Sequence, residues 1–465
     1  MFRASSFNII VNIPRSSDVI LVNGLTGAID QIDAEIARYI DAEMPQAERS
    51  NITELRKNSV NYLTERGYIT TLDEQAELKY AESIMYSLEA NELNRHPTFY
   101  LMPTYDCQLR CTYCFEHGTR NIGHRQGWAD RRIEPEVISA AFAAMDKISP
   151  NPIHKTCTLY GGEPLMPENV VCVKKIIQVA NQYGYSIMAA SNAFDLQNFF
   201  DVLGPKGIAG LHVPVDGNEI THDKLRFSKS RKQTFKRIIE NISEALERGV
   251  RVRMRINANR EVLNNLEIFA DELEYLGFTQ SPLFSCYVKA IFPIKSSLSK
   301  GRSMITDADI ADALASSVRL SKIFSGYPVF HHRIDSLFFE RSRDALRPYH
   351  CGASNGKILV FDPFGYIFPC NNVVGDQMHH IGRYYPSFYW DELSMAKWSQ
   401  RTVPRIPDTK NCKYALFCGG GCHYDALVAH GEINVTSCNC TEFARTFKGL
   451  IISTYQRILS DSIKY

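Results

Sequence analysis

The sequence predicts an α/β fold whose central part is an open partial (β/α)6 TIM-like barrel. Short β-rich runs alternate with helical patterns between residues 98 and 300, and consecutive βα units form parallel sheets with right-handed crossovers. Six such units are too few to close an eight-stranded barrel. Because 465 residues exceed one ordinary hydrophobic core, we also expect separate domains towards the two ends of the chain.

The bulk composition excludes several classes of partner. Hydrophobic residues make up 45% of the chain, charged residues 22%, and the net charge is +1. These values are typical of a globular protein and give no electrostatic basis for binding nucleic acid or an anionic membrane. The chain contains no run of about 18 apolar residues, and its first residues lack a secretory signal. We therefore expect a cytoplasmic protein that binds neither nucleic acid nor a membrane.

Residues 1–97 are predicted to form a small domain of their own. Two β-rich runs, Phe7–Ile13 and Asp18–Asn23, are joined by a turn and predict a hairpin. Helical patterns follow at residues 33–42, 52–65 and 72–94. A hairpin followed by helices is therefore expected at this end of the chain.

The barrel is assigned to residues 98–300. Its predicted strands are Thr98–Thr104, Thr156–Gly161, Ser186–Ser191, Leu211–Asp216, Val250–Asn257 and Leu283–Phe292. Ligands of parallel sheets gather at the carboxyl ends of the strands, so the motifs that follow these strands are the candidate site. Residues 301–345 are predicted to form a helical linker, with Asp307–Phe324 as its best helix, and residues 346–465 form a last, cysteine-rich domain that ends in a helix.

Three cysteines, Cys107, Cys111 and Cys114, follow the first strand at the spacing Cys-x3-Cys-x2-Cys. Cysteines in a reducing compartment indicate metal binding rather than disulfides. A [4Fe-4S] cluster normally takes four thiolates, so a loop that supplies three leaves one iron open to a small molecule. A structural zinc site is the alternative, but zinc prefers four ligands, usually as two separated Cys-x2-Cys pairs. The loop therefore favours an iron–sulfur cluster.

This loop, with Tyr113 before its last cysteine, resembles the cluster loop of the radical S-adenosylmethionine (SAM) enzymes. The resemblance implies that the open iron binds SAM and that reductive cleavage of SAM yields a 5′-deoxyadenosyl radical, which takes a hydrogen atom from the substrate. It also implies SAM contacts at the strand ends, although a Gly-Gly-Glu-Pro element taken alone is compatible with a tight turn that carries an exposed glutamate. The implied SAM-binding residues are Tyr113, Gly161, Gly162, Glu163, Pro164, Ser191, Asn192, Asp216 and Arg226.

A second group of cysteines lies nearer the C-terminus and resembles the SPASM domain, which holds two auxiliary [4Fe-4S] clusters. The implied ligands are Cys351, Cys370 and Cys422 for the first cluster and Cys412, Cys418 and Cys438 for the second. Thr409 stands where the family has a seventh cysteine, and Cys440 is an extra cysteine and a candidate ligand of the second cluster, behind Cys438. Zinc is again the alternative, but a zinc ribbon needs only four ligands. We therefore expect three [4Fe-4S] clusters in all.

The hairpin and helices of residues 1–97 resemble the winged-helix-like peptide-recognition domain of radical SAM peptide maturases. In those enzymes a leader peptide adds as a strand to a sheet edge. A structural cap and a DNA-binding winged helix are the alternatives, and DNA binding is disfavoured because the hairpin and residues 52–68 carry no concentrated basic face. Leader-peptide recognition is therefore the favoured interpretation.

Taken together, the resemblances imply an oxidoreductase that modifies a precursor peptide made by the ribosome. Such an enzyme abstracts a hydrogen from a peptide residue and lets the carbon radical form a thioether, carbon–carbon or ether crosslink, with a flavodoxin or ferredoxin as electron donor. Anaerobic sulfatase-maturating enzymes have an aspartate after the cysteine that matches Cys370, whereas this chain has Asn371, whose amide cannot accept a proton. A sulfatase-maturase-like or cofactor-precursor enzyme and a non-catalytic iron–sulfur electron carrier stay as alternatives. An electron carrier would have no use for the Gly-Gly-Glu-Pro element.

Overall fold

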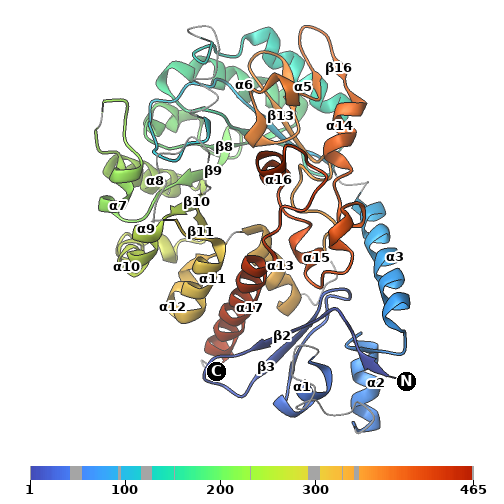
Figure 1. The fold of residues 1–465 in the computed structure, drawn as a ribbon. Coiled ribbons are helices and arrows are strands. Elements are labelled where there is room, and N and C mark those ends of the chain that lie inside the picture. The colour runs from blue at the N-terminus through green and yellow to red at the C-terminus, as the bar shows by residue number, and fades with distance from the viewer. Residues whose placement is uncertain are drawn as a thin grey trace.

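The computed structural model describes residues 2–41, 55–92, 96–116, 128–150, 152–230, 232–291, 304–326, 328–339 and 345–462. A large sheet with its helices fills one half of the molecule, and a smaller N-terminal sheet lies at the other end (Figure 1). The C-terminal helix α17 (Cys440–Ser462) runs from the cysteine-rich region towards the N-terminal sheet (Figure 1). Across the described ranges, we find no helix with the length and apolar character needed to cross a membrane.

The large sheet follows the predicted order of βα units. Its strands from the barrel region are β6 (Thr98–Leu101), β7 (Thr156–Leu159), β8 (Ser186–Ala190), β9 (Ile208–Pro214), β10 (Arg251–Ala258) and β11 (Phe284–Ala290). Each strand pairs in parallel with the next one along the chain, which confirms the six predicted units. The parallel part also includes β12 (Phe324–Ser325) beside β11 and β13 (Ile358–Phe361) beside β6, neither of which was predicted.

The helices of this region share one apolar core with the strands. They are α5 (Pro135–Ile148), α6 (Val170–Tyr183), α7 (Glu219–Leu225), α8 (Phe235–Glu247), α9 (Arg260–Asn264) and α10 (Leu266–Tyr275). On β10, Val252, Met254 and Ile256 are buried in this core. Because side chains alternate along a strand, the arginines between them face away from the helices.

The fourth strand of the barrel begins earlier than predicted. Strand β9 starts at Ile208 rather than Leu211, with Gly210 inside it. A Cβ at Gly210 would come within 2.3 Å of Met188 Cε on the neighbouring strand. That atom is the flexible end of the Met188 side chain, and Gly210 continues the strand without ending it.

The predicted helix Asp307–Phe324 is broken into α11 (Asp307–Ser316) and α12 (Val318–Ile323). Leu320 N donates to Ser317 Oγ at 3.2 Å, so Ser317 caps a second helix instead of continuing the first. A third helix, α13 (Pro328–Phe339), follows β12. The predicted linker thus contributes a strand to the large sheet as well as helices.

The N-terminal region contains the predicted hairpin. Strands β2 (Asn8–Asn12) and β3 (Val19–Asn23) pair antiparallel, and a third strand, β4 (Ile29–Ile32), pairs with β3. The remaining elements are β1 (Arg3–Ala4), α1 (Ala34–Ile40), α2 (Lys57–Glu65), β5 (Ile69–Thr70) and α3 (Glu74–Glu92). The predicted helix ends at residues 42, 52–54 and 93–94 lie outside the described residues. Strand β4 was missed because its sequence, Ile-Asp-Gln-Ile, is short and half polar.

Both faces of the N-terminal sheet are buried. Every residue of β3 is buried. Ile20 and Val22 share a core with the C-terminal helix α17, whereas Leu21 packs with residues of α1 and α2. Residues 1–97 therefore share part of their hydrophobic core with the C-terminal helix α17.

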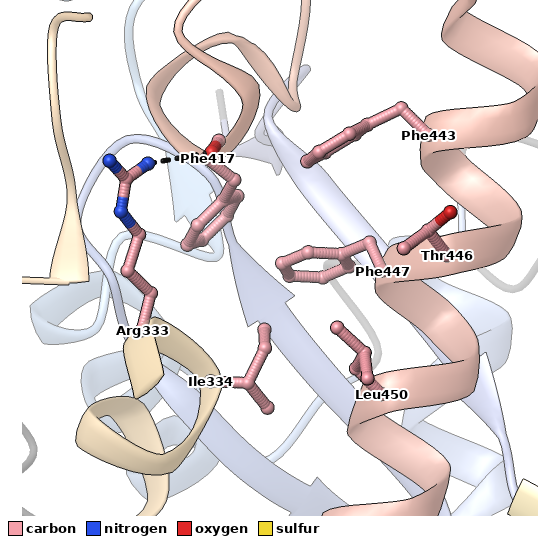
Figure 2. Close-up of a pocket in the computed structure, with 7 residues that line it drawn as sticks. All are labelled: Arg333, Ile334, Phe417, Phe443, Thr446, Phe447 and Leu450. Carbon is pink, nitrogen blue, oxygen red and sulfur yellow. Dashed lines mark hydrogen bonds between the residues drawn. The ribbon is translucent and has the colours of Figure 1, made fainter. Parts of the chain in front are cut away.

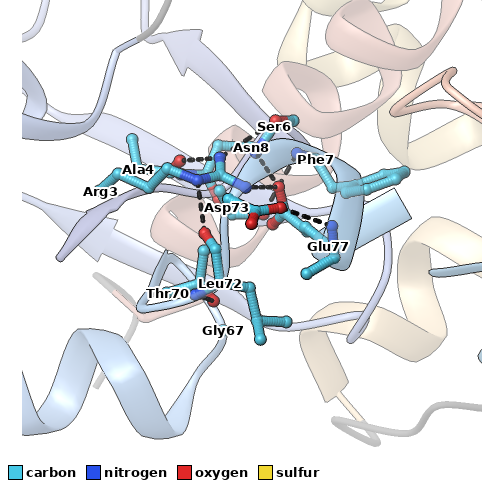
Figure 3. A network of polar contacts seen from close by, with 12 residues as sticks. Arg3, Ala4, Ser6, Phe7, Asn8, Gly67, Thr70, Leu72, Asp73 and Glu77 are labelled. Atoms are coloured by element: carbon cyan, nitrogen blue, oxygen red, sulfur yellow. Dashed lines mark hydrogen bonds and ion pairs between the residues drawn. The ribbon is translucent and has the colours of Figure 1, made fainter. Parts of the chain in front are cut away.

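Helix α3 connects the N-terminal sheet to the cysteine-rich region (Figure 1). At its first end, Glu77 forms an ion pair with Arg3 at 2.8 Å, which ties β1 to the helix (Figure 3). Towards its other end, Glu89 accepts hydrogen bonds from Thr402 Oγ1 at 2.6 Å and from Arg405 Nε at 2.7 Å. The helix therefore contacts both the first strand of the chain and the C-terminal region.

The C-terminal region extends the large sheet and packs on the helices of the predicted linker, α11, α12 and α13. Its elements are β14 (Tyr366–Phe368), β15 (Gly382–Arg383), β16 (Tyr389–Trp390), α14 (Glu392–Ser399), α15 (Ala415–Cys418), α16 (His423–His430) and α17. A small apolar pocket lies between α13 and α17, where Phe447 and Leu450 face Ile334 (Figure 2). Arg333 Nη1 at its edge donates to Phe417 O at 2.9 Å. Residues of α13, α15 and α17 therefore pack against one another around this pocket.

Candidate active site

The cysteine loop follows β6 and is held by the segment after α7. Arg110 N donates to Phe227 O at 2.7 Å, and Thr112 N donates to Leu225 O at 2.9 Å. These contacts join the first βα unit to the fourth. Within the loop, apolar side chains pack together in one small cluster with a residue that follows β8. The cluster consists of Cys107, Leu109, Cys111, Tyr113, Cys114 and Phe194.

Gly161 and Gly162 follow β7 and lie against the backbone that leads into the cysteine loop. A Cβ on Gly161 would come within 2.7 Å of Thr104 O, and one on Gly162 within 2.0 Å of Asp106 O. Gly161 also has a φ of +107°, a conformation that favours glycine. The two glycines therefore let the turn after β7 pack closely against the backbone that leads into the cysteine loop.

Glu163 is 1% exposed, and its carboxylate is bonded within the protein. Oε1 accepts from Leu165 N at 2.8 Å and Ser191 Oγ at 2.7 Å, and Oε2 accepts from Asn192 N at 2.6 Å. Burial raises the pKa of Glu163 to about 7, and these hydrogen bonds oppose the rise. Glu163 therefore links the end of β7 to the end of β8, which rules out an exposed glutamate on a simple turn. Pro164 lies in the same turn, where its carbonyl accepts from Asn169 Nδ2 at 3.2 Å.

Asn192 extends this link to the cysteine loop. Its Nδ2 lies 3.7 Å from Cys107 Sγ and 3.3 Å from Gln108 Oε1. Gln108 Nε2 in turn donates to Asp195 Oδ2 at 3.1 Å. The structure therefore brings Ser191, Asn192 and Glu163 next to the first of the three cysteines.

Tyr113, Asp216 and Arg226 form one polar cluster. The Tyr113 hydroxyl donates to Asp216 and accepts from Arg226 Nη2 at 2.6 Å. Arg226 Nε lies 3.4 Å from Asp216 Oδ2. Asn257, at the carboxyl end of β10, donates to Tyr113 Oη at 3.0 Å and to Asp216 Oδ1 at 2.9 Å. Residues implied as SAM contacts from three separate segments thus meet at the strand ends.

A buried cation beside the cysteines fits an anionic cluster. Burial opposes the charge of Arg226, but Cys111, Tyr113 and Asp216 outweigh it and raise the pKa of Arg226 well above its usual value. Within the described ranges, no three His, Cys, Asp or Glu side chains converge to hold a single metal ion. The thiolates of a four-iron cluster bind different irons and need not converge on one point. The positive charge of Arg226 beside the three cysteines is therefore compatible with an anionic, thiolate-bound cluster.

Cys351, Cys370 and Cys422 come together from three segments of the C-terminal region. Burial raises the pKa of Cys370, and the neighbouring thiols of Cys351 and Cys422 raise it further. Burial, followed by Asp425 and Cys351, raises the pKa of Cys422 to about 12. The three cysteines implied for the first auxiliary cluster are therefore neighbours in the fold.

Cys412, Cys418, Cys438 and Cys440 form a second group. The hydrogen bond with Cys418 raises the pKa of Cys438, and burial and Cys440 raise it further. Burial raises the pKa of Cys412, and Cys418 and Cys440 add to this. Cys440 is exposed and is the first residue of α17. The extra cysteine therefore lies with the three cysteines implied for the second auxiliary cluster.

Arg401 is a buried cation that joins the backbones next to both cysteine groups. Its guanidinium donates to Gly421 O at 2.6 Å, Gly420 O at 3.0 Å and Val435 O at 2.7 Å, and the residue is 0% exposed. Within the described part of the chain, Arg401 has no carboxylate within 4.0 Å. Burial lowers the pKa of Arg401, and Cys422, Cys351 and Cys418 oppose this. The neighbouring cysteines and Asp425 therefore stabilise the charge of this buried guanidinium, and a thiolate-bound cluster would add to this effect.

No motif in the sequence identifies Asn257 or Arg401 as a site residue. Asn257 has a usable signal, because it is a polar residue at the carboxyl end of a predicted strand, where other candidate residues also lie. Arg401 carries no such signal, since it lies in a short segment after α14 with no motif around it. Its role depends on carbonyl groups that only the fold brings to it.

Solved structures with the same fold include two that extend over most of this chain. The structure of native anSMEcpe with bound AdoMet matches with a TM-score of 0.61 at 14% sequence identity and covers 79% of this chain and 100% of that one. The structure of Streptococcus suis SuiB bound to precursor peptide SuiA matches with a TM-score of 0.55 at 13% identity and covers 94% of this chain and 99% of that one. A comparison with curated protein sequences found no match.

A family model matches the part of the chain that carries the cysteine loop and the strand-end motifs. The family is the radical SAM superfamily, and the match spans residues 101–267. This range contains Cys107, Cys111 and Cys114 as well as the Gly-Gly-Glu-Pro element. Residues 101–267 of this chain therefore form a domain of the radical SAM superfamily.

Proposed function

We propose that this enzyme modifies a ribosomally made precursor peptide and installs a thioether, carbon–carbon or ether crosslink. SAM bound to a reduced [4Fe-4S] cluster would supply a 5′-deoxyadenosyl radical for the abstraction of a hydrogen atom. Cys107, Cys111 and Cys114 would hold that cluster. The protein's own task is to orient SAM and to bring one residue of the peptide to the radical.

The observation that carries this proposal is how far the fold match extends along the chain. Residues 98–465 make up about 79% of the chain, which is the share covered by anSMEcpe. SuiB, solved with a precursor peptide, covers 94%. These shares are what we expect if SuiB has a counterpart of the N-terminal region and anSMEcpe does not. A precursor with a leader sequence is therefore our proposed substrate.

Strand β4 is the proposed edge for the leader peptide. Asn23 N donates to Ala28 O at 2.9 Å, and hydrogen-bonded pairs alternate along an antiparallel ladder. The backbone groups of Ile29 and Gln31 therefore point to the outer edge of the sheet. Arg66 Nη2 donates to Ile29 O at 3.1 Å from outside, which agrees with this assignment. The outer groups of Gln31 are the natural place for strand addition.

The strand-end residues are proposed to bind SAM. Arg226 supplies a cation for an anionic group, and Asp216 and Tyr113 hold Arg226 in place. Glu163 keeps the ends of β7 and β8 together, so its contribution to SAM binding is through the backbone it positions. An electron donor such as a flavodoxin or ferredoxin would reduce the cluster. The two cysteine groups of the C-terminal region would hold the auxiliary clusters.

Asn371 weighs against oxidation of a sulfatase. It follows Cys370 directly and begins a 3₁₀ turn, Asn371–Val373. Its Oδ1 is buried and has no hydrogen-bond partner within the described residues. An amide oxygen in this position can orient a donor group but cannot act as a base near neutral pH. A crosslink, in which the substrate radical is captured by another side chain, is the outcome that needs no base at residue 371.

The test is anaerobic incubation of the reconstituted enzyme with SAM, a reductant and the peptide encoded by a short reading frame beside the gene. A crosslink predicts a product mass lower by two hydrogen atoms, with no group that reacts with a hydrazide. A hydrazide-reactive aldehyde on a sulfatase-derived peptide would favour the sulfatase-maturase alternative. Absence of SAM cleavage under these conditions would favour an electron carrier.

A further inference from the structure

The face of β10 that is turned away from the helices carries three arginines. Arg251 and Arg253 are exposed and Arg255 is half-buried, in alternation with buried apolar residues. Side chains two residues apart on one strand face are separated by about 6.6 Å. On this face of β10, Arg255 is therefore the neighbour of Asn257, which contacts Tyr113 and Asp216. The arginines form a row that leads away from the candidate SAM site.

The neighbouring strands add polar groups without negative charge. Arg253 lies beside His212 of β9 and Ser285 of β11, and Arg255 lies beside Tyr287. Tyr287 Oη and His212 Nε2 are hydrogen-bonded at 2.8 Å. Burial, followed by Arg255 and Arg253, lowers the pKa of His212 to about 3. The histidine is therefore neutral, and the row keeps a net positive charge.

Arg253 and Arg255 have no carboxylate within 4.0 Å in the part of the chain that the structure describes. Arg255 Nε is buried without a hydrogen-bond partner among these residues, and the Arg253 guanidinium lies 5.3 Å from the centre of the Tyr287 ring. By contrast, the exposed guanidinium groups of Arg319 and Arg405 are paired with glutamates. Two adjacent cations that form no ion pair among these residues repel each other, so the pair favours an anionic ligand.

We propose that Arg253 and Arg255 bind acidic side chains of the peptide substrate, next to the residue that is modified. This inference rests on the proposed function, because it assigns the substrate of the same site. An extended peptide presents side chains on one side at the same spacing of about 6.6 Å as the two arginines. Each guanidinium can hold one carboxylate through two parallel hydrogen bonds. The pair therefore suits two acidic residues that are separated by one residue.

SAM is a second source of a carboxylate, and the test must separate the two. Fluorescein-labelled, capped peptides that contain Glu-Ser-Glu or Gln-Ser-Gln are titrated with the reconstituted enzyme at low salt, and binding is followed by fluorescence anisotropy. We expect the Glu-Ser-Glu peptide to bind about tenfold more tightly, as charge-assisted hydrogen bonds predict. The variant R253Q/R255Q should lose this preference. The matched variant R248Q/R319Q, which removes two exposed charges elsewhere, should keep it.

Equal binding of the two peptides by the unmodified enzyme, or a preference that survives in R253Q/R255Q, would overturn the inference. A loss of SAM affinity in R253Q/R255Q, measured by equilibrium dialysis, would also overturn it, because the carboxylate would then be that of SAM. Reductive SAM cleavage by the unmodified enzyme without peptide is measured in parallel. If cleavage occurs and the preference does not, this inference fails while the proposed function stands.

Discussion

Thr409 Oγ1 donates a hydrogen bond to the carbonyl oxygen of Val403 at 2.6 Å. The same hydroxyl lies 2.8 Å from Ile406 O, and Thr409 is 5% exposed. The Thr409 side chain therefore stabilises the turn that precedes Cys412, and its hydroxyl is not available to contact the cysteine thiols. We infer that Cys440, which lies with Cys412 and Cys438, supplies the thiol that position 409 lacks.

Replacing Cys440 by alanine is expected to lower the iron bound per chain by about one atom, the iron that loses its thiolate, and by about four where the whole cluster is lost. The reason is that Cys440 is exposed, so an iron that loses this ligand faces water. The measurement is iron content after anaerobic reconstitution, with Cys172→Ala on α6 as the control. Full iron content in the Cys440 variant would assign the second cluster to Cys412, Cys418 and Cys438 alone.

Replacement of Arg401 and replacement of the nearby Arg405 should have different effects on stability and on bound iron. Arg401 is fully buried and bonded to backbone carbonyls, whereas Arg405 pairs with Glu89 at the surface. Removing one partner from a buried charged site costs on the order of 3–5 kcal/mol, and an exposed pair contributes about 1 kcal/mol or less. We therefore expect Arg401→Gln to lower the melting temperature strongly and to lose auxiliary iron.

Arg405→Gln should leave both quantities nearly unchanged. Differential scanning fluorimetry and iron analysis on the same samples check this. Similar behaviour of the two variants would mean that Arg401 does not stabilise the auxiliary sites.

Asp362 gives the fold a pH dependence that can be isolated. It is 1% exposed, and its carboxylate accepts from Tyr105 Oη at 3.0 Å and Tyr366 N at 2.8 Å. Burial raises the pKa of Asp362 from 3.8 to about 7. Because the folded-state pKa lies above the unfolded value, the folded protein keeps a proton that the unfolded chain releases. This contribution to stability is fully present below pH 3.8 and is lost as the pH rises to about 7.

Asp362→Asn should remove this pH dependence. The amide can donate to Tyr105 Oη, and its oxygen can keep the backbone hydrogen bonds. The unmodified protein should lose on the order of 3–4 kcal/mol of stability relative to the variant between about pH 4 and pH 8. Melting temperatures of both proteins at a series of pH values measure this. Parallel profiles would contradict a raised pKa at Asp362.

Gln31→Pro tests the proposed leader site on β4. Proline removes the outward N–H and cannot accept strand addition there, so we expect precursor affinity to fall by about tenfold or more, since the strand's hydrogen bonds supply affinity. SAM cleavage without peptide should be retained. Gln31→Ala is the control, because it keeps the backbone N–H and should bind the precursor normally. Truncation of the whole region is a poorer test, since β3 shares its core with α17.

The local parts of the fold could be predicted from the sequence. The β2–β3 hairpin, the six βα units and the cysteine loop each have a pattern within a short stretch of chain, and the structure contains them. Strand β13 could not be predicted in this way, because its partner is β6, far away in the sequence. The two-sided burial of Val19–Val22 did carry a signal, since an unbroken apolar run favours a strand covered on both faces.

In the candidate site, too, single residues could be predicted from local motifs, whereas their contacts could not. Tyr113, Asp216 and Arg226 were found one by one through motifs, and the structure adds that they bond to one another. Glu163 was found by its motif, but its bonds to Ser191 and Asn192 depend on the pairing of β7 with β8. Motifs thus locate residues, and the sheet decides which atoms they meet.

The central claim is that Cys107, Cys111 and Cys114 hold the cluster that cleaves SAM. The most direct measurement is the yield of 5′-deoxyadenosine from SAM and a reductant, in the reconstituted enzyme and in the variant with all three cysteines changed to alanine. We predict product from the enzyme and none from the variant, which should also bind about four fewer iron atoms. Continued formation of 5′-deoxyadenosine by a folded variant would contradict the account.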